Sequence, residues 1–329
     1  MVMIQVQDLV KEFSRPAVQR GRFAGLRSLF TTERTVTRAV DGLSFDIEPG
    51  ELVGYLGPNG AGKSTTIKML TGILVPTSGR LVVAGQVPWQ DRRSSSRNIG
   101  VVFGQRTQLW YDLPLRDSFE ALRDLYEIDA ATYLQRMGTF TEMLGLDEFI
   151  DTPVRSLSLG QRMRGDLVAA MLHAPPIVYL DEPTVGLDVV AKARIREFVA
   201  ESNTSSGTTI MLTTHDMDDV EQLCRRIIII DSGRVLYDGD LDTLKARYVP
   251  YRDLVVTPAD GVDPSTIRMP LAQTRIDDQG RALLRFDPAE IPSPKLISEV
   301  TSAHGIVDLT VREPDLEDVI HRLYGEGAG

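Results

Sequence analysis

A glycine-rich run from residue 57 to residue 65 has the residue types and spacing of a phosphate-binding loop. It fits the pattern G-x-x-x-x-G-K-[ST] at every fixed position. The glycines let backbone N–H groups turn inward around phosphate oxygens, Lys63 adds a charge for the β- and γ-phosphates, and the Ser64 hydroxyl is placed to ligate Mg²⁺. The run predicts a site for a nucleoside triphosphate, formed by Gly57, Asn59, Gly60, Ala61, Gly62, Lys63, Ser64 and Thr65.

Two adjacent carboxylates, Asp181 and Glu182, follow an apolar run at residues 177–180. Because side chains alternate in direction along a strand, neighbouring carboxylates at its end can take different roles. Asp181 would hold Mg²⁺ through its water, and Glu182 would polarise the attacking water. Such pairs also occur in solvated turns, but the Pro-Thr pair that follows and the phosphate loop upstream favour the catalytic interpretation.

These residues need strands and helices to position them. The apolar run 52–56 between two glycines predicts a buried parallel strand, and 64–74 predicts the helix after the loop. Further predicted strands are 4–9, 43–47, 81–84, 99–103, 177–180, 209–213 and 226–230, with helices over most of 115–149 and 160–174. Strands that alternate with helices argue for a mostly parallel α/β sheet.

Composition excludes several classes of protein. The 329 residues carry a net charge of −10, with 42% apolar and 25% charged residues, which is typical of a soluble globular chain. The acidic balance argues against a nucleic-acid partner. The single cysteine, Cys224, cannot form an internal disulfide and fits a reducing cytoplasm. No apolar run approaches the roughly 18 residues that a membrane helix needs.

One segment departs from the acidic average. Residues 11–38 contain seven basic and two acidic residues, a local charge of +5. Apolar residues at 23, 26, 29 and 30 recur at helical spacing and predict a short amphipathic helix. This basic insertion, residues 14–38, is either a solvated surface segment or a contact with anionic lipid headgroups at a membrane surface.

The phosphate-binding loop, the acidic pair and a third motif together make the chain resemble the ATP-binding subunits of ABC transporters, over roughly residues 2–240. The run Leu-Ser-Leu-Gly-Gln at 157–161 is similar to the family's LSGGQ signature, with Leu159 in place of a glycine. Ser158 can cap the helix that begins near Gly160, whose free N–H groups suit a γ-phosphate. The resemblance implies that Ser158, Gly160 and Gln161 reach the ATP of a second copy, in a head-to-tail dimer that shares two ATP molecules.

The resemblance also assigns roles to four single residues. Gln105 matches a glutamine that touches the metal and the water, and His215 matches a histidine that hydrogen-bonds the γ-phosphate. Asp188 lies in the loop that bridges the two subunits, and Phe13 stands where an aromatic ring often stacks on adenine. In the family, the segment after Gln105 receives a helix of the membrane subunit. Trp110 and Tyr111 are therefore either an exposed contact or simple core packing.

The implied fold is α/β, an ABC ATPase domain with a RecA-like core, an antiparallel β subdomain and a helical subdomain at about 106–172. The ABC domain covers residues 1–245, and a small C-terminal α+β accessory domain covers 250–329. A narrower resemblance, in the sequence around Gln105, the segment 76–79 and the basic insertion, is to type 2 ABC exporters.

The resemblance to these exporters implies an ATP-hydrolysing, Mg²⁺-dependent subunit on the cytoplasmic face of the cell membrane. Closure of its dimer would power translocation by separate permease subunits. The alternatives are an ABC importer ATPase and a soluble ABC ATPase without a membrane partner. The transported substrate is not readable, because substrate selection resides in the membrane subunits.

Overall fold

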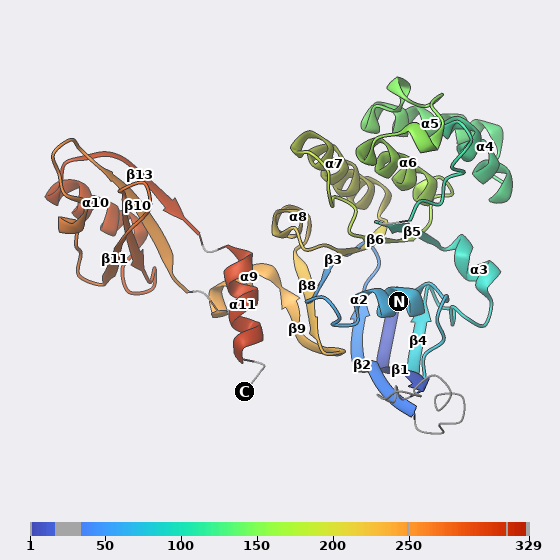
Figure 1. The fold of residues 1–329 in the computed structure, drawn as a ribbon, viewed down its shortest axis with the longest axis horizontal. Coiled ribbons are helices and arrows are strands. Elements are labelled where there is room, and N and C mark those ends of the chain that lie inside the picture. Colours follow the sequence, from blue (N-terminus) through green and yellow to red (C-terminus); the bar gives the residue numbers. More distant parts are fainter. Residues whose placement is uncertain (1, 17–33, 105, 249, 314, 327–329) are drawn as a thin grey trace, which may run out of the picture. The chain divides into compact units, whose positions relative to one another are not determined.

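The computed structural model describes residues 2–16, 34–104, 106–248, 250–313 and 315–326 (Figure 1). The chain divides into two compact units, Met1–Gly239 and Asp240–Gly329. Most of the basic insertion, including its predicted amphipathic helix, lies outside the described residues, and so does Gln105. The described ends of the insertion continue two paired strands, because Pro16 lies opposite Arg34 in an antiparallel ladder.

The first unit contains two sheets. A three-stranded antiparallel sheet has the order β2-β1-β4, and a six-stranded sheet has the order β5-β6-β7-β3-β8-β9. The strands are β1 Ile4–Pro16, β2 Arg34–Ile47, β3 Leu52–Leu56, β4 Ser78–Val83, β5 Ile99–Phe103, β6 Ile177–Asp181, β7 Thr209–Thr213, β8 Arg226–Asp231 and β9 Arg234–Asp240. The strands from β5 to β8 in that order are parallel and almost wholly buried, which explains their uninterrupted apolar sequences.

One hydrophobic core joins the two sheets of the first unit. Ile4 of β1, Tyr55 of β3 and Tyr179 of β6 belong to a single cluster, each 0% exposed. The helices are α2 Lys63–Leu70, α3 Arg92–Arg97, α4 Leu115–Leu125, α5 Ala130–Leu144, α6 Leu159–Met171, α7 Val189–Ser206 and α8 Met217–Leu223. Three of them, α4, α5 and α6, fall between β5 and β6, where the sequence predicts a helical insertion.

The second unit is a four-stranded antiparallel sheet with helices, in the order β11-β12-β10-β13. Its elements are α9 Leu241–Tyr248, β10 Arg252–Pro258, β11 Ala272–Ile276, β12 Ala282–Phe286, α10 Ser293–Ala303, β13 Ile306–Arg312 and α11 Leu316–Glu326. Leu254, Leu284 and Leu296 pack in its separate core. The sequence assigns residues 241–245 to the first domain, but they lie in α9, and this helix groups here with α11.

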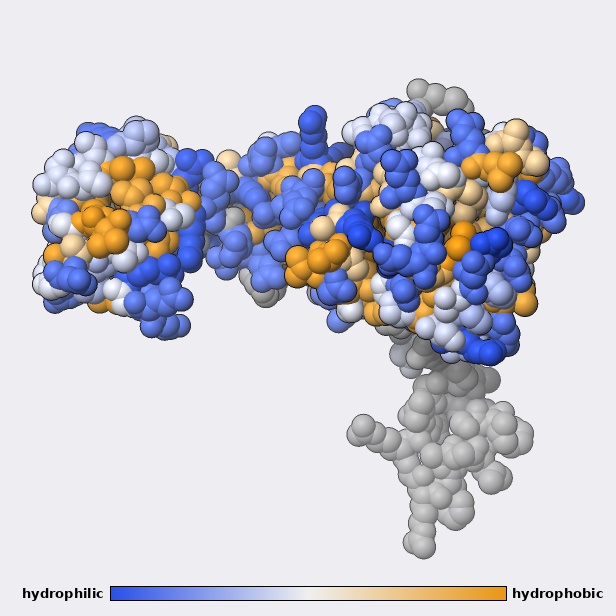
Figure 2. All heavy atoms as spheres, turned by 90° about the horizontal axis from the view of Figure 1, so that it is seen from above, coloured by the Kyte–Doolittle hydropathy of each residue, from blue (hydrophilic) through white to orange (hydrophobic). Residues whose placement is uncertain are grey.

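On the visible face, apolar side chains form a broad patch on the second unit and smaller patches among the hydrophilic side chains of the first (Figure 2). Exposed large apolar residues occur in the first unit at Trp110 and Val189, for example, and in the second at Leu271 and Val307. Within the described part of the chain, no helix combines the length and hydrophobicity that crossing a bilayer requires.

Candidate functional site

The predicted phosphate-binding loop lies between β3 and α2, at the carboxyl end of a buried strand. Two of its glycines are fixed by close backbone contacts. A Cβ at Gly57 would lie 2.5 Å from the carbonyl oxygen of Ile230, and one at Gly62 would lie 2.5 Å from that of Ala39. Gly62 also has a φ of 110° and is the N-cap of α2. Glycine is therefore required at both positions, and the loop presents the N-terminus of α2 to the site.

Lys63 lies across this loop, close to the acidic pair. Its Nζ donates to the carbonyl oxygens of Gly57 at 2.5 Å and Pro58 at 3.2 Å. Burial lowers the pKa of Lys63, while the carboxylates of Glu182 and Asp181 act in the opposite direction. The lysine predicted from the loop motif and the carboxylates predicted 118 residues later therefore belong to one electrostatic site.

The other loop residues differ in exposure. Those with exposed surface are Asn59, Gly60 and Ser64, whereas Thr65 is half-buried. Ala61 is 2% exposed, and its N–H donates to the carbonyl oxygen of Pro58 at 3.1 Å. Ala61 therefore anchors the loop from inside, and the exposed residues form the surface that a phosphate would meet.

The acidic pair lies where β6 ends, beside the end of β7. Thr213 Oγ1 donates to Asp181 Oδ1 at 2.5 Å, and the N–H of Glu182 donates to the carbonyl oxygen of Thr213 at 2.9 Å. Glu182 has a φ of 57°, in the left-handed region that non-glycine residues seldom adopt. Such backbone strain is concentrated at functional sites and persists where neighbouring contacts enforce it. Thr213 holds both residues of the pair, a role that was not predicted from the sequence.

Glu182 and His215 are in direct contact. His215 Nδ1 lies 2.7 Å from Glu182 Oε2, although His215 is 72% exposed. Burial raises the pKa of Glu182, and the nearby His215 opposes that rise. A carboxylate with a raised pKa beside an imidazole is suited to accept a proton from a water molecule.

A buried charged network lies beside Glu182 and His215 and was not predicted from the sequence. Asp219 is 0% exposed; it accepts a hydrogen bond from the Thr184 hydroxyl and pairs with Arg196 at 2.9 Å. Lys192, on the same helix as Arg196, pairs with Asp216. The network ties α7 and α8 to the segments that follow Glu182 and His215. No local pattern marks it, because its members come from three separate segments.

The signature segment forms the first turn of α6. The Ser158 side chain accepts from the N–H of Gln161 at 3.2 Å, and the Gln161 side chain accepts from the N–H of Ser158 at 2.9 Å. This reciprocal capping box fixes the start of the helix. Leu159 is 37% exposed and packs against Gly186. A Cβ at Gly186 would lie 3.0 Å from Cδ2 of Leu159. A Cβ at Gly160 would lie 3.4 Å from the Cβ of Ala191, so α6 and the start of α7 pack closely.

Asp188 is the N-cap of α7 and accepts from the N–H of Ala191 at 2.8 Å. The next two residues are unusually exposed for their type, Val189 at 78% and Val190 at 65%. Exposed β-branched apolar side chains in series mark a surface suited to a protein partner.

Two aromatic predictions concern residues outside these segments. Phe13 lies in β1 opposite Thr37, is half-buried, and has the Lys11 ammonium 5.4 Å from its ring centroid. Trp110 and Tyr111 are 43% and 56% exposed, which favours the exposed loop over core packing. The aromatic rings therefore remain accessible on the surface of the first unit.

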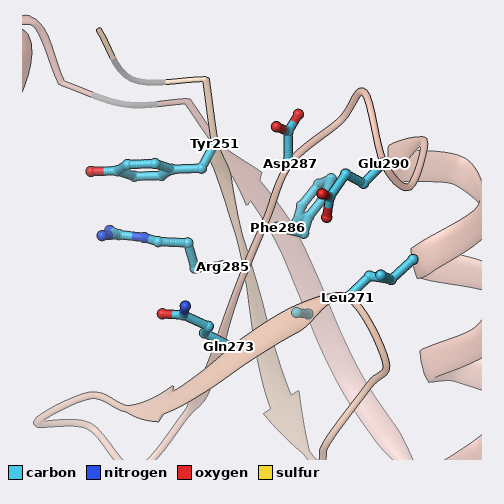
Figure 3. Close-up of a pocket in the computed structure, with 8 residues that line it drawn as sticks. Tyr251, Leu271, Gln273, Arg285, Phe286, Asp287 and Glu290 are labelled. Atoms are coloured by element: carbon cyan, nitrogen blue, oxygen red, sulfur yellow. The ribbon is translucent and has the colours of Figure 1, made fainter.

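The second unit has a hollow of its own, about 440 Å³ in volume. Figure 3 shows Tyr251, Arg285 and Gln273 side by side at one end of it, with Asp287 and Glu290 at the other. The Arg285 guanidinium lies 3.9 Å from the Tyr251 ring centroid and is also paired with a neighbouring carboxylate. The residues predicted to bind the nucleotide belong to the first unit, whereas every residue that lines this hollow belongs to the second.

The family model described as "ABC transporter" matches residues 40–185. The chain is 35% identical to the Nod factor export ATP-binding protein I of Ralstonia nicotianae over 92% of both chains. It is 32% identical to the daunorubicin resistance ATP-binding protein DrrA3 of Streptomyces coeruleorubidus, over 88% of this chain and 92% of the relative. A solved ATP-binding subunit of an ABC transporter superposes with a TM-score of 0.62 at 24% identity, over 75% of this chain and 93% of that one. The predicted fold class is confirmed.

Proposed function

The chain belongs to the ABC transporter family of ATP-binding proteins, and we propose that it is the ATP-hydrolysing subunit of an exporter with separate permease subunits. The observation that carries this proposal is the gathering of Lys63, Asp181, Glu182 and His215 at the carboxyl ends of three neighbouring parallel strands. The phosphates of ATP bind to the loop N–H groups and to Lys63. Phe13 stacks on the adenine ring from the adjoining antiparallel sheet.

The donor atoms present fit Mg²⁺. A Ser64 hydroxyl and an Asp181 carboxylate are hard oxygen ligands, and Gln105 is a proposed third. Among the described residues no cluster of three or more His, Cys, Asp or Glu side chains could enclose an ion. Mg²⁺ commonly keeps water and phosphate oxygens in its shell, so a site with few protein ligands suits it. Bound there, the ion would neutralise charge on the phosphates.

Hydrolysis depends on Glu182 and His215. Glu182 accepts a proton from the attacking water, and its raised pKa favours that transfer. His215 holds the Glu182 carboxylate through the 2.7 Å contact and hydrogen-bonds the γ-phosphate. Thr213 keeps Asp181 oriented toward the metal, so one strand, β7, supports both functions.

Two copies of the chain form the complete catalytic unit, arranged head to tail. In this arrangement Ser158, Gly160 and Gln161 of one copy reach the ATP bound by the other, and Asp188 lies between the copies. The exposed apolar side chains at the start of α6 and of α7, Leu159, Val189 and Val190, support a partner at this surface. Because the capping box fixes the first turn of α6, the helix presents ordered N–H groups to an anion.

Separate membrane subunits receive the motion through the exposed loop around Trp110. Relatives similar over almost the whole chain are named for Nod factor export and daunorubicin resistance, which favours export over import. The chain then works at the cytoplasmic face of the membrane. An importer ATPase would share every catalytic residue, and a soluble ABC ATPase would share them without needing a membrane partner.

ATP turnover by the purified full-length chain tests the catalytic assignment. Glu182→Gln is expected to bind ATP normally and to lose at least about a hundred-fold in kcat, the contribution of a general base. Lys63→Ala is expected to weaken ATP binding itself. Asp218→Asn, an exposed carboxylate near His215, is the matched control and keeps full activity. Full turnover in Glu182→Gln would refute the assigned role.

Affinity purification from detergent-solubilised membranes tests the transport assignment. Co-purification of polytopic membrane proteins with the tagged chain is the expected result. A catalytically active dimer that brings down no membrane protein would instead favour the soluble ABC ATPase. A periplasmic or extracellular solute-binding protein in the same complex would favour the importer.

A further inference from the structure

A buried carboxylate outside the nucleotide site joins the signature helix to the segment that follows residue 105. Asp166 lies in α6, eight residues after Ser158, or about 12 Å along the helix axis. It is only 5% exposed. Its Oδ1 accepts from Thr107 Oγ1 at 2.8 Å and from the N–H of Gln108 at 3.1 Å. Gln108 Nε2 in turn donates to the carbonyl oxygen of Asp166 at 3.2 Å, so three hydrogen bonds connect the two segments.

Apolar packing reinforces this connection one residue earlier in α6. A Cβ at Gly165 would lie 2.8 Å from a methyl group of Leu115 and 3.0 Å from one of Leu109. Leu109 is 5% exposed, although it lies in a loop. The absence of a side chain at Gly165 therefore lets the segment 107–109 lie directly on the helix, and Asp166 fixes its register there.

The segment continues into the exposed loop that contains Trp110. The N–H of Trp110 donates to Ser118 Oγ in α4 at 3.2 Å, and the carbonyl oxygen of Tyr111 accepts from the N–H of Arg155 at 2.9 Å. Ser118 is fully buried, so this attachment is also internal. The loop is fastened at successive residues to the helical region, with Asp166 as its attachment to the signature helix.

We propose that Asp166 is a positioning residue that makes the signature end of α6 and the loop around Trp110 move as one body. It contacts neither nucleotide nor reacting atoms and acts through Thr107 and Gln108. Nucleotide contact at Ser158 would thereby reach the surface proposed to face the membrane subunits. The inference rests on the proposed function for the identity of those two surfaces, and on the hydrogen bonds for the link between them.

Trp110 fluorescence tests the link in the full-length chain. The only other tryptophan is Trp89, so a Trp89→Phe background leaves Trp110 as the sole reporter. Thr107→Val removes the hydroxyl donor at nearly constant volume, and Thr107→Ser keeps it. We expect binding of the non-hydrolysable Mg·AMPPNP to change Trp110 emission in the parent and in Thr107→Ser. In Thr107→Val the amplitude is expected to fall, because loss of one hydrogen bond to a charged group weakens the link between the two segments by about ten-fold in its equilibrium constant.

Nucleotide affinity, measured by calorimetry, is expected to stay within about three-fold of the parent in both variants, because the link lies outside the binding site. Asp166→Ala removes the acceptor of two of the three hydrogen bonds, so we expect it to lower the amplitude at least as far as Thr107→Val does. Adding Thr107→Val to Asp166→Ala is expected to lower it no further. Equal amplitudes in the Val and Ser variants would overturn the inference, and so would a parent that binds nucleotide without a change in Trp110 emission. A parent that binds no nucleotide would contradict the proposed function itself.

Discussion

Asp166→Asn offers a quantitative test of how deeply this carboxyl is buried. Burial raises the pKa of Asp166 from 3.8 to about 6, while the hydrogen bonds from Thr107 and Gln108 and the charge of Arg162 act in the opposite direction. Because the folded pKa is raised, the folded state keeps its proton at a pH where the unfolded chain has released it. The wild type is therefore most stable, relative to Asn, at low pH, and loses this advantage as pH rises from about 4 through about 6.

The size of the effect follows from the two pKa values. Each pKa unit corresponds to about 1.4 kcal/mol, so full ionisation of the buried carboxyl costs the fold about 3 kcal/mol. Between pH 5 and pH 7 the linkage relation gives about 1 kcal/mol of this change in the free energy of unfolding. Asparagine keeps an oxygen acceptor for Thr107 and Gln108 and has no charge, so all other titrating groups cancel in the difference between the two proteins.

Urea unfolding of both proteins at several pH values, followed by tryptophan emission, measures this difference. Both tryptophans lie in the first unit, so the signal excludes unfolding of the second. The free energy of unfolding of the wild type, minus that of Asp166→Asn, is expected to fall by about 1 kcal/mol from pH 5 to pH 7. A difference that stays constant would show that burial does not raise the pKa of the Asp166 carboxyl. A difference that rises with pH would show that the hydrogen bonds outweigh burial.

Two further substitutions test the packing of the site, each with an internal control. Gly57→Ala places a Cβ against the Ile230 carbonyl and is expected to destabilise the first unit by about 1–3 kcal/mol in urea unfolding. A Cβ at Gly138 on α5 would meet no atom within 4 Å, so Gly138→Ala is expected to stabilise the first unit by about 0.5–1 kcal/mol. Equal effects of the two substitutions would contradict the contact assigned to Gly57. Arg196→Met leaves the buried Asp219 without its cation and is expected to cost about 3 kcal/mol. Arg155→Met breaks an exposed pair instead, and a midpoint shift as large as that of Arg196→Met would refute the distinction.

The phosphate-binding loop was predictable because its requirements are local. A tight turn of N–H groups before a helix needs glycines at fixed positions, and the close contacts at Gly57 and Gly62 follow from that requirement. The buried parallel strands were predictable because both of their faces are covered, which leaves uninterrupted apolar runs in the sequence. The edge strands β9 and β11 were missed, because solvent on their surface relaxes the apolar pattern and leaves only a weak alternation.

Side-chain partnerships across the site were not predictable from the sequence. Thr213 holds Asp181 from a neighbouring strand, and Asp219 meets Thr184 and Arg196 from two other segments. Each pair depends on the packing of elements far apart in the chain, and a single sequence carries no local mark of such contacts. Asp166 was missed for the same reason. A charged residue within an apolar helical stretch signals a buried partner but does not identify Thr107 or Gln108.

An acidic chain can bind a highly anionic ligand because the attraction is local and geometric. The net charge of −10 says nothing about the turn at Gly62, where backbone dipoles converge, or about Lys63, whose half-buried ammonium lies beside that turn. The same corner also holds Asp181 and Glu182, which repel a γ-phosphate at close range. A cation between phosphate and carboxylate removes that repulsion while leaving Glu182 able to accept a proton. Under the proposed function, the negative charge that opposes nucleotide binding therefore makes it dependent on Mg²⁺, and ties binding to the residues assigned to hydrolysis.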